Sequence, residues 1–197
     1  EIRWRNALEV GDMCTTGQVL EKSVGIKQTL AAVKDAYHEA RRAGHAVGIG
    51  LGLKNSGLGN GFREVSHAVV RFASSGRVEV RHGWTEMGQG VHTVALQVAA
   101  QELGIDPNRI DVIVDTTRQL GFGQTTGSRG TLMAAGSVQQ ACHVALAAGC
   151  VEEVDYEGEH LVDWTRKLGD ANEPNPTIHA AFGYASDIKL LELAHLN

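Results

Sequence analysis

Two glycine-rich segments, each followed by a run of helical periodicity, constrain the fold of this chain more than any other feature. They cover residues 83–90 and 121–130 of a 197-residue chain that contains 24 glycines and 3 prolines. That glycine content is roughly 12%, against an average of about 7% in globular proteins. Glycine adopts backbone conformations that other residues avoid, and it lets a backbone approach a partner closely. We therefore expect both segments to be loops with a specified backbone geometry.

The apolar periodicity predicts a chain in which helices and strands alternate. Helical spacing indicates three amphipathic helices, over residues 25–44, 91–103 and 131–148. Alternating or short apolar runs indicate four strands, over residues 46–53, 65–72, 77–81 and 110–114. Three further segments are expected to be a loop (54–61), an acidic strand and loop region (150–177), and a strand or helix (179–193). The pattern predicts an α/β (α+β) fold, a mixed sheet with helices packed on it, in residues 23–197, after an arm or linker at residues 1–22.

Composition excludes several classes of protein. Hydrophobic residues make up 43% and charged residues 21% of the chain, near globular averages, and no apolar run is long enough to cross a membrane. The net charge is −5 and no basic run occurs, which argues against nucleic acid or anionic lipid as a partner. The three cysteines lack metal-site spacing, which favours a reducing compartment and argues against a metal held by protein ligands. We expect Cys142 and Cys150 to be buried core thiols.

The two glycine-rich segments are candidates for binding an anion through backbone N–H groups. A helix start presents unpaired N–H groups and a partial positive charge, and two such starts in one layer suit a ligand with several phosphates. In the other interpretation the glycines serve only turns, and Thr126 and Ser128 cap the following helix. The residues alone leave both interpretations open.

Other named motifs do not fit. The second segment lacks the lysine and the glycine spacing of a Walker A loop, and neither residues 48–50 nor residues 57–59 continue as a dinucleotide-binding GxGxxG. No GxSxG or HExxH motif occurs. The acidic residues between 152 and 159 are expected to form a solvated loop, and His92 is expected either to bind an anion or to serve as a capping or core group of its helix.

Four segments carry a resemblance to one family. Residues 83–93 (GWTEMGQGVHT) closely resemble the TEMGQGxHT segment of the molybdenum hydroxylases, the xanthine dehydrogenase and aldehyde oxidase family. Residues 123–131 (GQTTGSRGT) are similar to a later Thr/Ser/Ala/Gly-rich loop of that family, in its bacterial form. Residues 2–12 and 174–184 resemble its VRWKN…GD and PNP…H..FGYA segments. The chain is thus identified as a fragment of the molybdopterin-binding region of a bacterial-type molybdenum hydroxylase.

The resemblance implies that both loops bind the molybdenum cofactor, along its phosphates and beside the metal. The implied cofactor-binding residues are Gly88, Gln89, Gly90, His92 and Thr93 in the first loop and Thr126, Gly127, Ser128 and Arg129 in the second. The second loop would offer N–H groups and the Arg129 cation. The cofactor would be molybdopterin, in its cytosine dinucleotide form, and its dithiolene would hold the molybdenum, so no protein metal ligand is expected. Other domains or subunits would carry [2Fe-2S] and FAD.

The same resemblance implies an oxidoreductase parent that hydroxylates a purine, an N-heterocycle or an aldehyde with oxygen from water. The family's general base, a Glu in a GxGE-type segment, would lie downstream, so no catalytic residue is expected here, Glu86 included, and this chain alone should be inactive. Expected partners are the small-molecule substrate, the rest of the parent and its iron-sulfur and FAD parts, in the cytoplasm. The alternative is a non-catalytic module that binds a pyrophosphate ligand or acts as a scaffold in a larger complex.

Overall fold

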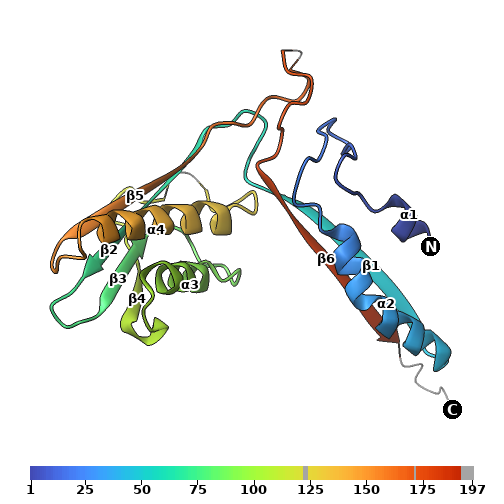
Figure 1. The fold of residues 1–197 in the computed structure, drawn as a ribbon, viewed down its shortest axis with the longest axis horizontal. Coiled ribbons are helices and arrows are strands. Elements are labelled where there is room, and N and C mark those ends of the chain that lie inside the picture. Colours follow the sequence, from blue (N-terminus) through green and yellow to red (C-terminus); the bar gives the residue numbers. More distant parts are fainter. Residues whose placement is uncertain (122–123, 171, 192–197) are drawn as a thin grey trace. The chain divides into compact units, whose positions relative to one another are not determined.

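The computed structural model describes residues 1–121, 124–170 and 172–191, and it confirms a mixed α/β architecture (Figure 1). These residues form two compact units. Unit 1 consists of Glu1–Asn60 and the described residues from Thr165 onward, and unit 2 is the continuous stretch Gly61–Trp164. Parts of two expected segments, the glycine-rich loop at 122–123 and the end of 179–193, lie outside the described residues.

Unit 2 is built on a four-stranded mixed sheet of order β4-β3-β2-β5. Its strands are β2 (Glu64–Phe72), β3 (Val78–His82), β4 (Ile110–Val114) and β5 (Asp155–Val162). Strand β2 is antiparallel to both of its neighbours, whereas β3 and β4 are parallel. The parallel pair requires a crossover, which is supplied by helix α3 (Val91–Leu103) and the short 3-10 helix η1 (Pro107–Arg109).

Helices α3 and α4 (Gly130–Ala147) contribute to the core on one face of this sheet. Val70 and Val80 from the strands pack with Ala95 of α3 and Val138 of α4 in one buried cluster. Helix α4 approaches β5 closely because β5 has a glycine there: a Cβ on Gly158 would stand 2.2 Å from the backbone nitrogen of Ala141. This burial of apolar surface is the main source of stability for unit 2.

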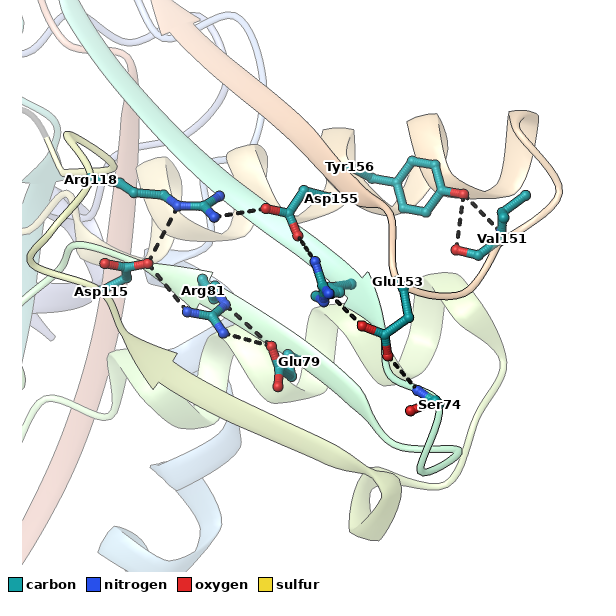
Figure 2. Close-up of polar contacts among 10 residues, drawn as sticks. Ser74, Glu79, Arg81, Asp115, Arg118, Val151, Glu153, Asp155 and Tyr156 are labelled. Atoms are coloured by element: carbon teal, nitrogen blue, oxygen red, sulfur yellow. Dashed lines mark hydrogen bonds and ion pairs between the residues drawn. The ribbon is translucent and has the colours of Figure 1, made fainter.

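The opposite face of the sheet is charged, since Glu79 and Arg81 alternate along β3 with the core valines. Arg81 donates to Glu79 (2.7 Å) and to Asp115 (3.4 Å), and Arg118 donates to Asp155 (2.7 Å) and pairs with Asp115 at 3.6 Å (Figure 2). Asp115 and Arg118 follow β4 in the chain. These contacts therefore bind the segment that follows β4 in the chain to two strands of the sheet, β3 and β5.

Unit 1 pairs two strands that are far apart in sequence, β1 (Ala46–Ser56) and β6 (Ala181–Leu191), antiparallel over their full length. Helix α2 (Ile26–Arg42) contacts both strands, and Thr29 of α2 shares a hydrogen bond with Ser186 of β6 (2.8 Å). A short helix α1 (Ile2–Asn6) precedes them. The side-chain oxygen of Gln18 accepts N–H groups from Ile178 (3.0 Å) and His179 (2.9 Å), so residues near the chain start are bound to residues near its end.

Several details differ from the sequence-based expectations. Helix α1 lies in the stretch expected to be an arm or linker, where no helix was predicted. Strand β1 runs three residues into the expected loop at 54–61 because Ser56 still pairs with Ala181. The ambiguous segment from 179 is a strand in its described part. Cys142 is buried as expected, whereas Cys150 is only half-buried, at the turn after α4. The arm or linker at residues 1–22 stays a prediction.

No helix in the described ranges is long and apolar enough to cross a membrane.

Candidate functional site

The starts of helices α3 and α4 lie together in unit 2. A Cβ on Gly130, the first residue of α4, would lie 3.7 Å from Cγ2 of Val91, the first residue of α3. Neither N-cap residue, Gly90 or Arg129, caps its helix with its side chain. The structure thus places two helix starts side by side, as a ligand with several phosphates would require.

The two loops that lead to these helices cross each other closely. A Cβ on Gly83 would stand 2.3 Å from the backbone nitrogen of Gly121, and a Cβ on Gly121 would stand 2.6 Å from the carbonyl oxygen of Gly83. Only glycine fits on either side of such a crossing. Next to it, the N–H of Thr85 in the first loop donates to Oγ1 of Thr125 in the second (3.1 Å).

The first loop uses the carboxylate of Glu86 to satisfy the N–H groups at the start of α3. Oε1 of Glu86 accepts from Gly88 (2.8 Å) and Gly90 (2.9 Å), and Oε2 accepts from His92 (3.4 Å). These bonds, that of Gly90 above all, lower the pKa of Glu86 below its usual range, because they stabilise the charged carboxylate. The N–H groups of Gly88, Gly90 and His92, which the sequence analysis proposed as donors to a bound anion, are therefore bonded to the carboxylate of Glu86. The position of Glu86, four residues before Gly90, was the signal in the sequence that could have predicted these bonds.

The side chain of Gln89 braces the same loop. Its oxygen accepts the N–H of Met87 (2.6 Å) and its nitrogen donates to the carbonyl of Thr85 (2.7 Å). Gly88 and Gln89 are nevertheless exposed, as is Thr93 on the first turn of α3. The first loop therefore presents an ordered, solvent-facing surface.

The second loop reaches α4 through two consecutive residues in the left-handed region, Gly127 (φ 66°) and Ser128 (φ 51°). Thr126 and Ser128 are exposed. The N-cap of α4 is Arg129, so the alternative in which Thr126 or Ser128 occupies the N-cap position is wrong for this helix.

The side chain of Arg129 points into the interior of unit 2 rather than toward solvent, and the residue is 4% exposed. Its guanidinium donates to the carboxylate of Glu64 (3.3 Å) and to the carbonyl of Gln124 (2.6 Å), and it lies over the ring of Trp84. The role of Arg129 as a cofactor-binding cation stays a prediction. Sequence reasoning did not identify Glu64 or Trp84 as parts of this arrangement.

Two histidines stand at the two ends of the first loop, His82 on β3 and His92 on α3, with ring centroids 5.2 Å apart. His82 is fully buried and its Nδ1 accepts the N–H of Trp84 (3.0 Å), while His92 is half-buried on α3. Burial, with a smaller contribution from the nearby His92, lowers the pKa of His82 to about 4, so His82 is neutral at pH 7. Within the described residues, Nε2 of each histidine is buried without a hydrogen-bond partner. Such orphaned polar atoms are uncommon in a finished core and are consistent with a ligand or water above them.

Titratable side chains in the described ranges form no cluster of three or more His, Cys, Asp or Glu that could hold a metal ion. The two crossing loops present backbone N–H groups, exposed hydroxyls and an exposed amide, which are groups that can bind a ligand.

Comparisons with known proteins identify the family of this chain. Residues 20–152 match the family described as "Molybdopterin cofactor-binding domain". The chain is 36% identical over 102 residues to the 6-hydroxypseudooxynicotine dehydrogenase complex subunit gamma of Paenarthrobacter nicotinovorans, covering 51% of this chain and 13% of that protein. It is 25% identical over 182 residues to a probable xanthine dehydrogenase subunit of Bacillus subtilis, covering 87% of this chain and 24% of that protein.

The fold has solved counterparts. The structure superposes on the aldehyde oxidoreductase from Desulfovibrio desulfuricans with a TM-score of 0.74 and 21% sequence identity, covering 95% of this chain and 23% of that one. This chain spans less than a quarter of the length of each of these three proteins. The family match covers well over half of the present sequence. The chain therefore belongs to the molybdopterin cofactor-binding domain family, within the molybdenum hydroxylases.

Proposed function

We propose that this chain supplies part of the molybdopterin-binding surface of an enzyme that oxidises an N-heterocycle, a purine or an aldehyde. The observation that carries the proposal is the pairing of two helix starts behind two loops that cross at Gly83 and Gly121. The relatives include proteins whose names refer to nicotine, xanthine and aldehyde, which supports the three substrate classes. The full activity belongs to a longer parent protein.

The two loops take different parts of the cofactor. The start of α4 is the better phosphate site, because Glu86 already occupies N–H groups at the start of α3. We assign phosphate oxygens to the N–H groups of Thr126, Gly127, Ser128 and Arg129, and the first loop contacts the cofactor through Gly88, Gln89, Gly90, His92 and Thr93. When bound, the cofactor supplies the molybdenum redox centre, and this chain holds and orients it.

Four finer assignments complete the proposal. The cofactor is the cytosine dinucleotide form, and the general base lies outside this chain, which has no activity by itself. The [2Fe-2S] and FAD groups belong to other domains or subunits. A cytoplasmic location is supported by three free cysteines.

The test introduces negative charge at the proposed phosphate site of the parent protein. Thr126→Glu and Ser128→Asp change exposed side chains, so folding is retained while an incoming phosphate is repelled. Gln140→Glu adds the same charge to an exposed position further along α4 and is the matched control. Molybdenum is measured by mass spectrometry and the nucleotide by chromatography after acid release.

We expect at least a tenfold loss of molybdenum and nucleotide in the first two variants and none in the control. Full molybdenum content in both variants would refute the assignment of phosphate to the α4 start. Hydroxylation by this chain alone, assayed with a dye acceptor, would refute the placement of the base elsewhere. A parent gene without a GxGE segment would favour the non-catalytic module.

A further inference from the structure

Arg129 joins three segments of unit 2 that belong to different parts of the sequence. Its guanidinium contacts Glu64 at the start of β2, Gln124 in the second loop and Trp84 at the start of the first loop. Arg129 is 4% exposed and Glu64 is 1% exposed. Both charges are therefore withdrawn from solvent, in the region where the two loops meet.

The guanidinium of Arg129 makes a different contact through each of its edges and through its flat face. Nη1 lies 3.3 Å from Oε1 of Glu64. Nη2 and Nε both donate to the carbonyl of Gln124, at 2.6 and 3.2 Å, which closes the second loop on itself over five residues. The flat face lies 5.1 Å from the ring centroid of Trp84, within the range of a cation-π contact.

Trp84 is itself fixed in place, so it is a firm support for the guanidinium. Its indole N–H donates to Oγ of Ser66 on β2 (2.8 Å), and Ser66 shares a hydrogen bond with Ser137 of α4 (3.1 Å). Its backbone N–H donates to His82. Trp84 therefore connects the first loop to the sheet and to α4, and Arg129 connects the second loop to Trp84.

A buried ion pair is a weak source of stability, because desolvating two charges offsets most of their attraction. An apolar pair of the same volume would serve the core as well. A guanidinium provides what an apolar side chain cannot: a rigid fork for one carbonyl, a charge for one carboxylate and a flat face for one aromatic ring. The arrangement suits a role in fixing loop geometry.

We propose that Arg129 is a positioning residue, which holds the second loop against the first for cofactor binding, and that Glu64 is the counter-charge that allows it to be buried. This inference rests on the proposed function for its link to the cofactor. In this proposal the side chain of Arg129 acts through Gln124 and Trp84, and this role replaces that of the cofactor-binding cation that the resemblance implies.

The test compares Arg129→Lys with Arg77→Lys. Lysine keeps the charge beside Glu64 but lacks the fork for Gln124 and the flat face for Trp84. Arg77 is the matched control, because its exposed guanidinium makes a similar fork with Asp111 and donates to the carbonyl of Asn108 (3.0 Å) away from both loops. Amide hydrogen exchange is measured on the 197-residue chain by mass spectrometry, in peptides covering residues 124–132 and 138–147. Molybdenum content is measured in the parent protein.

In Arg129→Lys we expect at least tenfold faster exchange in residues 124–132, unchanged exchange in 138–147, and at least a fivefold lower molybdenum content. Arg77→Lys should change none of these. A purely structural ion pair would instead lower protection in both peptides together, and that result, or unchanged exchange in 124–132, would overturn the proposal. Faster local exchange with normal molybdenum content would also overturn it. A wild-type parent without molybdenum would refute the proposed function, and the exchange data would still decide whether Arg129 holds the loop.

Discussion

Gly83 and Gly121 touch backbone to backbone, and a Cβ atom on Gly83 would stand 2.3 Å from the amide nitrogen of Gly121. Both loops of the candidate site pass through this crossing. Neither glycine has a positive φ, so the constraint is the space between two backbones rather than a special conformation.

The added Cβ of Gly83→Ala should therefore push the two loops apart or strain the backbone at residues 83 and 121. We expect the free energy of unfolding to fall by about 2 kcal/mol or more, in the range seen for overpacked cores. Gly48→Ala is the control, since a Cβ there meets no atom within 4 Å, and it should change stability by less than about 0.5 kcal/mol. Urea denaturation measures both, and equal effects would contradict the crossing.

His82 should make unit 2 sensitive to mild acid. Burial lowers its pKa to about 4 from 6.5, so between these values the unfolded chain binds a proton that the folded chain does not. The free energy of unfolding should therefore fall as the pH drops from about 6.5 toward 4, by roughly 3 kcal/mol from this group.

His82→Asn tests this sensitivity, because asparagine offers an acceptor to the N–H of Trp84 and does not titrate. Urea denaturation at pH 7.5, 6.5, 5.5 and 4.5 should show a flatter pH dependence for the variant than for the wild type. Parallel curves would mean that His82 does not titrate as proposed.

Asp115 should stabilise the segment that follows β4 only while it is ionised. Its carboxylate accepts the hydroxyl (2.6 Å) and the N–H (2.9 Å) of Thr117. It also pairs with Arg81 and Arg118, as Figure 2 shows. The bonds from Thr117, followed by Arg81 and Arg118, lower its pKa, so the stabilisation is present above pH 4 and is lost as the carboxylate is protonated. Asp115→Asn should unfold at lower urea than the wild type at pH 7, and the difference should shrink toward pH 3. Asp35→Asn, which removes an exposed carboxylate on α2, should have no comparable effect.

The three thiols should react in two classes. Cys142 is fully buried in the α4 core, and burial, with smaller contributions from Glu102 and Cys150, raises its pKa to about 12. A thiol reagent at pH 8 should label half-buried Cys14 and Cys150 but leave Cys142 unlabelled until urea is added. Peptide mass spectrometry reads the sites, and labelling of native Cys142 would contradict its burial.

The three long helices and most strands could be predicted from the sequence because their signals are local. The apolar stripe that begins at Ile26 and the alternation around Val78 and Val80 correspond to α2 and β3 as observed. The starts of α3 and α4 were located for the same reason, since glycines precede each stripe.

Long-range partners could not be predicted. Nothing near Arg129 indicates that its charge is paired with Glu64, 65 residues earlier, and the family resemblance implied a cation that faces a ligand. The pairing of β1 with β6 is equally remote, and the apolar residues of β6 alone fit a strand and a helix equally well. The bond from Gly90 to the carboxylate of Glu86 is a contact between near neighbours in the sequence that was also not predicted. Glu86 was identified only as part of the family motif.

The two units also differ in when each becomes complete during translation. Unit 2 is one uninterrupted stretch, whereas β1 is finished at Ser56 and its partner β6 begins only at Ala181. At a synthesis rate of about 5–20 residues per second, β1 waits on the order of ten seconds for its partner. The edge of β1 that pairs with β6 lacks that partner throughout the interval, and an unpaired edge is a template for pairing with other chains. The nascent chain is therefore most prone to aggregation while unit 2 is being synthesised. During that interval helix α2, which is made before β1, can already pack against it.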